Sequence, residues 1–190
     1  GPEAALEQAI DAAESSIDMA IYDLDLDGVR SALLRAQDRG VAVRLVVESD
    51  NLHTPAMLSL IAAGIPVVAD NRPPLMHDKF TVIDGREVWT GSMNYTVNDA
   101  YFNDNNLVRL KDGAAAEAYA AEFDEMFGQS RFGALSALSN EGQALSADRQ
   151  GLEIYFAPED GVARRVVELI EGAQQEVVFL AFSLTAPDIA

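Results

Sequence analysis

Cysteine is absent from the 190 residues, and only two of them are histidine. Without thiols, neither a disulfide nor a thiolate metal site can form. His53 and His77 lie in different segments of the chain, so a histidine-based metal centre is not predicted either. We therefore expect no metal and no other cofactor. The sequence also has no run of about 20 apolar residues, so we predict no transmembrane segment.

Basic residues are scarce, because 13 Lys and Arg stand against 31 Asp and Glu, for a net charge of −18. Affinity for nucleic acid comes largely from Lys and Arg that neutralise phosphates. This balance therefore argues against broad, nonspecific DNA binding, and it would repel an anionic bilayer. Local attraction of one phosphate is still compatible with it, because Arg72, Lys79, Arg86 and Arg109 surround a single segment. We interpret most of the acidic surface as a solubility feature.

The sequence does not fix the compartment. Gly1-Pro2 is typical of a processing scar, and no signal peptide is visible within the chain, so we expect any such peptide to lie upstream of Glu3. A secreted and a cytoplasmic protein are equally compatible with the lack of cysteine.

The segment from Leu75 to Asn94 carries the densest group of chemically useful side chains. It reads LMHDKFTVIDGREVWTGSMN and fits the pattern H-x-K-x4-D-x6-G-S-x-N at every specified position. The six residues that match are His77, Lys79, Asp84, Gly91, Ser92 and Asn94. At roughly one in twenty for each position, a chance match in a chain of this length is rare.

The local pattern predicts how these residues come together. Residues 76 to 83 alternate with a period of two, which predicts a strand with His77 and Lys79 on the same face. Asp84-Gly85 is a strong hairpin signal, and residues 87 to 90 would return as a second, antiparallel strand. The hairpin would deliver the G-S-x-N end of the motif beside the histidine.

Each residue type suits the binding and cleavage of a phosphate ester. A neutral histidine such as His77 can attack phosphorus, whereas a protonated one can only donate a proton. Lys79 supplies a positive charge that would hold a phosphodiester and offset charge on its oxygens. Asn94 and Ser92 offer neutral donors, and Gly91 lets the backbone come close. Asp84 falls at the hairpin turn and points away by parity, so we interpret it as structural.

The H-x-K-x4-D and G-S-x-N elements together resemble the signature of the phospholipase D superfamily. The resemblance implies an active site built from two such motifs, one from each of two repeats or from each subunit of a homodimer, without a metal. One histidine would form a phosphohistidine, and the other would protonate the leaving oxygen and then activate water. His77 would be nucleophile or general acid, Lys79 and Asn94 would bind phosphate, Ser92 would assist, and Asp84 would be mainly structural.

One position departs from the family pattern. Members often carry a carboxylate eleven residues after the motif asparagine, where it orients the histidine, and the equivalent residue here is Asn105. An amide oxygen could still accept a hydrogen bond from His77, but it would stabilise an imidazolium less well. His77 would then be the less basic of the two active-site histidines, or the activity of this half of the site would be weakened.

The rest of the chain predicts an α/β fold. We expect helices at 3–15, 28–39, 53–63 and 114–127, with a helical turn at 94–100. We expect further strands at 17–24, 41–48, 65–69 and 106–110. Asp27 is the expected cap of the second helix. The order predicts a mixed β-sheet flanked by helices on both faces, which is the phospholipase D-like α-β-α sandwich that the resemblance implies.

The domain plan follows from a second pattern. Residues 3–127 would form the phospholipase D-like domain, 128–150 a linker, and 151–190 the beginning of a second, truncated repeat. The last segment predicts a strand at 152–156, a helix at 162–173 and a strand at 176–184. With a shift of 160 residues, its positions match the N-terminus as Ile10 with Ile170, Ala13 with Ala173, Ile17 with Val177, Met19 with Phe179, Tyr22 with Phe182 and Leu24 with Leu184. Alternatively, two amphipathic segments merely look alike. We expect the segment 152–184, which has no partner strands of its own, to dock on the N-terminal sheet or on another subunit.

The leading hypothesis is a metal-independent phosphodiesterase that acts through a phosphohistidine. Its substrate would be a phospholipid or a nucleic acid, and the motif does not separate the two, nor hydrolysis from transfer to an alcohol. The second motif would come from a missing C-terminal half or from a homodimer partner. The competing hypothesis is a noncatalytic, phosphate-binding half of a two-repeat protein, which the Asn105 substitution favours.

Overall fold

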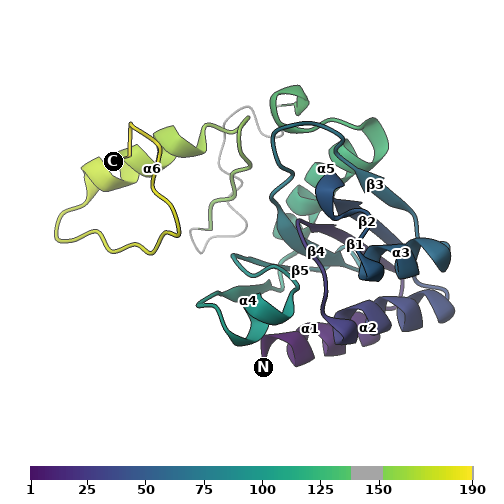
Figure 1. Ribbon diagram of the computed structural model, residues 1–190. Coiled ribbons are helices and arrows are strands. Elements are labelled where there is room, and N and C mark those ends of the chain that lie inside the picture. The colour runs from purple at the N-terminus through teal and green to yellow at the C-terminus, as the bar shows by residue number, and fades with distance from the viewer. Residues whose placement is uncertain (138–151, 190) are drawn as a thin grey trace.

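The computed structural model describes residues 1–137 and 152–189, and its centre is a six-stranded sheet (Figure 1). The strands are β1 (Ser16–Ile21), β2 (Ala42–Val47), β3 (Val67–Ala69), β4 (Lys79–Ile83), β5 (Glu87–Gly91) and β6 (Leu107–Leu110). Their order is β3-β2-β1-β4-β5-β6. β1, β2 and β3 are parallel, whereas β4 is antiparallel to β1 and to β5, and β5 to β6. The predicted mixed sheet is confirmed.

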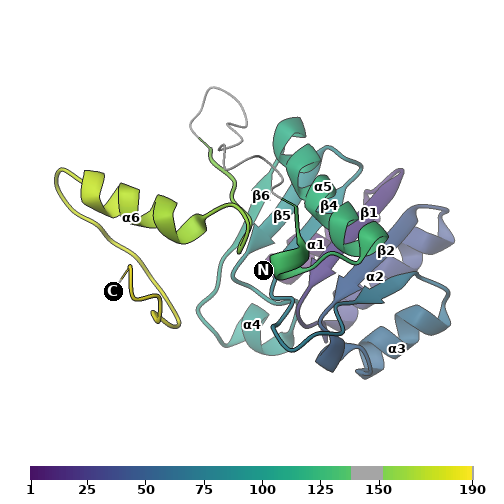
Figure 2. The ribbon, with the colours of Figure 1, turned by 90° about the horizontal axis from the view of Figure 1, so that it is seen from above.

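Helices cover both faces of this sheet, as predicted (Figure 2). The helices are α1 (Pro2–Asp11), α2 (Asp27–Asp38), α3 (Pro55–Ala62), α4 (Val97–Tyr101), α5 (Gly113–Gln129) and α6 (Val162–Gly172), with short 3-10 helices η1 (Ser49–Asn51) and η2 (Gly133–Leu135). α1, α2 and α3 pack on one face and α5 on the other. None of the helices in the described ranges is long and apolar enough to cross a membrane.

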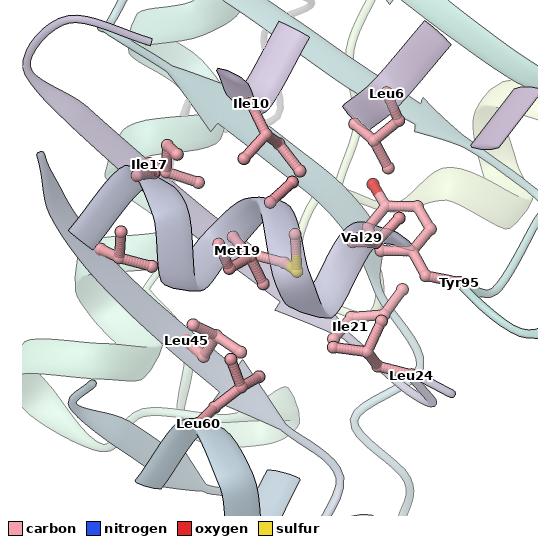
Figure 3. Packing of buried hydrophobic residues seen from close by; sticks show 14 of the residues in the cluster. Leu6, Ile10, Ile17, Met19, Ile21, Leu24, Val29, Leu45, Leu60 and Tyr95 are labelled. Atoms are coloured by element: carbon pink, nitrogen blue, oxygen red, sulfur yellow. The ribbon is translucent and has the colours of Figure 1, made fainter. Parts of the chain in front are cut away.

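Alternation along the central strands divides the interior into two cores. Ile17, Met19 and Ile21 of β1 are fully buried among the residues of α1 and α2, such as Leu6 and Val29 (Figure 3). Side chains of the opposite parity, including Ala20 of β1, Val46 of β2 and Phe80 of β4, pack against α5. The central strands are therefore apolar on both faces, as expected for strands covered by helices on two sides.

The β4–β5 hairpin forms as its sequence predicts. The Arg86 amide donates to the Ile83 carbonyl at 3.0 Å, and φ is +54° at Asp84 and +60° at Gly85. Positive φ at both central residues defines a type I′ turn, the one that Asp-Gly favours. The turn places β5 antiparallel to β4 with Ile83 opposite Glu87.

The structure corrects two local predictions. β4 begins at Lys79 and not at residue 76, because its neighbour β1 ends at Ile21, directly opposite Lys79. His77 therefore lies in the loop before the strand. Asp27 is the first helical residue of α2, whereas Leu26 is the residue at the N-cap, where no side chain accepts a hydrogen bond.

The C-terminal segment departs further from its prediction. α6 forms as expected, but no strand is present at 152–156, where Leu152 alone forms a β-bridge, or at 176–184. Ile154 and Phe156 pack against α5 and against Leu110 of β6, so this part of the segment contacts the edge of the sheet. Residues 176–184 lie exposed.

The predicted linker at 128–150 is partly outside the described residues. Its first part does not behave as a simple linker, because α5 continues to Gln129, Phe132 is buried against the α5 core, and η2 follows. Residues 138–150 are not described.

Asp84 ties the hairpin turn to the start of β1. Its carboxylate accepts hydrogen bonds from the amides of residues 14, 15 and 16 at 2.7 to 3.2 Å, and from the Ser15 hydroxyl at 2.8 Å. Burial opposes the charge, but these donors outweigh it together and lower the pKa of Asp84 to about 2.

We predict that Asp84→Asn lowers the free energy of unfolding by about 1–2 kcal/mol at pH 7, because a neutral amide accepts these bonds less well. Asparagine tolerates the left-handed backbone of the turn, so the effect isolates the charge. Since the pKa is lowered in the folded state, the stabilisation is present above about pH 4 and is lost as the pH falls toward 2. Urea unfolding across this range measures it, with the exposed Asp104→Asn as control. Equal losses at pH 7 and pH 2 would contradict the assignment.

Candidate active site

His77 lies at the mouth of the site, in the loop that precedes β4. Its side chain is exposed and meets the Tyr22 ring edge-on, with 4.8 Å between the ring centroids. The loop is held from beneath by Glu48, whose Oε2 accepts a hydrogen bond from the Met76 amide at 2.6 Å. Glu48 is buried at the end of β2, so the parallel half of the sheet positions the histidine.

Lys79 lies immediately below His77. It is the first residue of β4, is 9% exposed, and its Nζ donates to the His77 carbonyl at 2.7 Å. The same Nζ lies 5.1 Å from the centroid of the Tyr22 ring, a cation–π distance. Burial lowers the pKa of Lys79 to about 8, although Asp78 and Asp99 oppose that shift. The ammonium is therefore still mostly protonated at neutral pH.

The electrostatics of the site keep the His77 imidazole neutral. Burial and the nearby Lys79 charge lower the pKa of His77 below 6.5, and Glu48 partly opposes them. A neutral ring retains a nucleophilic nitrogen at pH 7. The arrangement therefore places an imidazole with a lowered pKa near a fixed ammonium, a combination that is chemically suited to attack on a phosphate ester.

Asn94 is held by a carboxylate that the sequence reasoning missed. Its backbone N–H and its Nδ2 both donate to Asp99 Oδ2, at 2.8 and 2.9 Å. Asp99 stands in the first turn of α4, where its own amide bonds the Thr96 hydroxyl. The run Thr96-Val97-Asn98-Asp99 has the S/T-x-x-D/E form of a helix start, so a signal for this residue was present in the sequence.

Ser92 and Asn105 bond to each other. The Ser92 hydroxyl donates to Asn105 Oδ1 at 2.9 Å and accepts from the Asn106 amide at 3.1 Å, while Asn105 Nδ2 reaches the Asp99 carbonyl at 3.4 Å. The partner of the Asn105 amide oxygen in this structure is the Ser92 hydroxyl, and no hydrogen bond joins Asn105 to His77 among the described residues. Asn105 thus supports the G-S-x-N loop.

Gly91 allows this loop to approach the next strand. Its φ is +150°, and a Cβ atom there would collide with the carbonyl of Asn106. Asp84, in contrast, lies at the far end of the hairpin and contacts the loop before β1. The structure therefore brings the histidine and lysine together at one end of β4, with the G-S-x-N loop entering from β5, and leaves Asp84 outside.

Within the described ranges, no three His, Cys, Asp or Glu side chains are arranged to hold a metal ion. The motif contributes one imidazole, one ammonium, one amide and one hydroxyl.

A comparison with protein families gives residues 6–127 as a match to the model described as cardiolipin synthase, PLD-like domain. The chain belongs to the phospholipase D superfamily. The match covers the whole sheet and nearly all of α5, which includes all six motif residues.

Relatives of this phospholipase D-like chain agree with that placement. It is 37% identical over 114 residues to a phospholipase D of Rickettsia prowazekii (strain Madrid E), a match that covers 59% of this chain and 56% of the relative. It is 31% identical over 117 residues to the mitochondrial cardiolipin hydrolase of Xenopus tropicalis, covering 60% of this chain and 56% of the relative. The chain thus spans about half the length of the curated relatives it matches.

A solved structure of the superfamily has the same fold. Nuc of Salmonella typhimurium, a phospholipase D family member, superposes with a TM-score of 0.61 at 29% identity, over 66% of this chain and 86% of that protein. The α/β class and the superfamily, both expected from the sequence, are confirmed.

The electrostatic balance at His77 can be tested by NMR titration. We predict a pKa below 6.5 for His77 in the 190-residue chain, a rise in Lys79→Met, and a further fall in Glu48→Gln, because these changes remove the two opposing charges. The side-chain amide oxygen that Glu48→Gln introduces can still accept from the Met76 amide, so the loop is retained. The His53→Gln variant assigns the two histidine signals. A His77 pKa that does not respond to Lys79→Met would contradict the coupling.

Proposed function

We propose that this chain is a metal-independent phosphodiesterase whose nucleophile is His77. The observation that carries the proposal is the contact between Lys79 and the His77 backbone, with the ammonium at 2.7 Å from the carbonyl. Burial, and then the Lys79 charge, lower the pKa of the His77 imidazole. A neutral nucleophile and a fixed cation at one strand end fit attack on an anionic phosphorus centre.

In the proposed reaction, an imidazole nitrogen of His77 attacks phosphorus and forms a phosphorus–nitrogen bond as the bond to the leaving oxygen breaks. A second histidine donates the proton that this oxygen takes up. The same histidine then removes a proton from water, whose oxygen attacks phosphorus and releases His77. Lys79, Asn94 and Ser92 hold the phosphate oxygens throughout. Asp99 positions Asn94 by accepting a hydrogen bond from its side-chain amide. An alcohol in place of water would give transfer.

The second histidine has to come from another copy of the motif. The proposal places it in a C-terminal half or in a homodimer partner. It also divides the chain into a domain at 3–127, a linker at 128–150 and the beginning of a second repeat at 151–190. In support, α1 starts at Pro2 and α6 at Val162, a spacing of 160 residues, which is the shift at which the two sequences match.

The substrate is a phosphodiester of a lipid or of a nucleic acid. The relatives' names include a phospholipase D and a cardiolipin hydrolase, and net charge of −18 disfavours a nonspecific nuclease. A second candidate function is a noncatalytic phosphate-binding half, because Asn105 replaces a carboxylate and bonds Ser92 instead of His77.

We predict that His77→Asn lowers turnover of bis(p-nitrophenyl) phosphate by about three orders of magnitude or more, because it removes the nucleophile. EDTA is present throughout, and His53→Asn, an exposed change outside the site, serves as matched control. The wild-type chain should also be trapped with phosphorus on His77 by rapid acid-free quench and mass spectrometry. Unchanged turnover in His77→Asn would reject the enzymatic role.

The mass of the chain in solution, measured with its turnover, tests where the second motif comes from. We expect activity to accompany dimerisation, since one chain carries only one motif and the chemistry uses two histidines. An active dimer would mean that two copies of His77 share one site. A silent monomer would assign the second histidine to a C-terminal half, and an active monomer would contradict the two-histidine mechanism.

A further inference from the structure

Tyr22 contacts both the imidazole and the ammonium of the site. It directly follows the last residue of β1 and is half-buried. Its ring meets the His77 ring at an angle of 67°, with 4.8 Å between the centroids, and the Lys79 Nζ lies 5.1 Å from the centroid of the same Tyr22 ring. The proposed reaction leaves this side chain without a role, although it touches the two groups on which that reaction depends.

The backbone of Tyr22 is fixed on two sides. Its amide donates to the Asp78 carbonyl at 3.1 Å, between His77 and Lys79 in the sequence. Its carbonyl accepts from Asn51 Nδ2 at 2.7 Å. A residue held at both its N–H and its C=O has little backbone freedom, so the ring is presented to the site from a defined position.

One short turn after β2 holds both members of the aromatic pair. Glu48, the N-cap residue of η1, accepts from the Met76 amide at 2.6 Å and so holds the loop of His77. Asn51, the last residue of η1, holds Tyr22. The Asn51 amide also donates to the Glu48 carbonyl at 3.0 Å. The spacing between the two rings is therefore set by the geometry of this turn.

The two contacts of Lys79 restrict its ammonium group. An ammonium has three N–H donors. One donor of Lys79 bonds the His77 carbonyl at 2.7 Å, and the electron-rich Tyr22 ring attracts the charge from another side. A lysine stem is flexible when nothing holds its head. With both contacts in place, the remaining donor is available to a phosphate oxygen from a defined position.

We propose that Tyr22 is a positioning residue for the reaction, and that Asn51 fixes it. The ring orients the imidazole of His77 for attack and holds the ammonium of Lys79 beside the phosphate, a role that rests on the proposed function. The His77 side chain is exposed, so the edge-to-face contact is what restricts its rotation. Tyr22 acts through these two side chains and needs no contact with phosphorus.

Turnover of bis(p-nitrophenyl) phosphate by the 190-residue chain tests the role of the ring. Tyr22→Leu should lower kcat about tenfold or more with a smaller change in KM, because a misoriented nucleophile reacts slowly. Tyr22→Phe keeps the ring and should stay within about threefold of the wild type. Tyr155→Leu, outside the site, is the matched control. An unchanged kcat in Tyr22→Leu, or an equal loss in Tyr22→Phe, would overturn the role of the ring.

The contact with the ammonium is tested by NMR without turnover. The sequence has only two lysines, and the exposed Lys111 serves as internal reference. Burial lowers the pKa of Lys79 to about 8, against the opposing charges of Asp78 and Asp99. Tyr22→4-cyanophenylalanine keeps the shape of the ring but withdraws electrons from its face. The pKa of Lys79 should therefore fall about 0.5 below its value in Tyr22→Phe. Equal values in these two variants would overturn the cation–π contact.

A double-mutant cycle tests whether Asn51 acts through Tyr22. Asn51→Ala should lower kcat about threefold in the wild-type background and have little further effect in Tyr22→Leu. Additive losses would contradict the link. Thermal unfolding checks that each variant is folded, and the two ring-containing variants decide the case if Tyr22→Leu does not fold. If the wild-type chain turns over no diester, the proposed function fails. The Lys79 titration and Overhauser contacts between the Tyr22 and His77 rings then still decide whether Tyr22 holds the two groups.

Discussion

The antiparallel pairing of β4 between β1 and β5 is the constraint on which the site depends. Backbone hydrogen bonds hold β4 from both sides, and its side chains alternate between two closed cores, with Phe80 toward α5 and Ile83 toward α1 and α2. A slip of one residue would exchange these faces. The register therefore fixes Lys79 at the end of β4, opposite the last residue of β1. Beyond this point β4 has no pairing with β1, so the preceding loop is accessible to a ligand.

The same lysine then organises the charges of the site. A buried ammonium is costly without compensation, and here it is supported by Asp78 and Asp99, by the His77 carbonyl and by the Tyr22 ring. Its charge adds to burial in lowering the pKa of the neighbouring His77 imidazole. Under the proposed function, this one cation would hold the phosphate and also favour the neutral form of His77. It would do so even in a chain with a net charge of −18, because short distances in a partly buried site outweigh the distant surface charge.

Much of the fold could be predicted from the sequence because its signals are local. The Asp84-Gly85 turn, the alternation in β4 and the helical spacing in α5 each lie within a few residues. The partners of the site residues could not be predicted in the same way. Glu48 contacts the loop of His77 from the end of another strand, and Asn105 forms its hydrogen bond with Ser92. Both contacts depend on how segments distant in the sequence pack together. Asp99 was predictable in part. The sequence showed the pattern of a helix start at this residue, but not its hydrogen bond with Asn94.

The two matching segments separate local propensity from tertiary support. α1 and α6 have the same spacing of apolar residues, yet Leu6 and Ile10 of α1 are fully buried while α6 has no buried residue. The residues after α1 form β1 because β2 and β4 supply its hydrogen bonds on both sides. The residues after α6 have the same pattern and no such neighbours in the described part of the chain, so Phe179 and Phe182 remain exposed. A helix can form from its own sequence, whereas a strand of this kind forms only when partner strands satisfy its backbone.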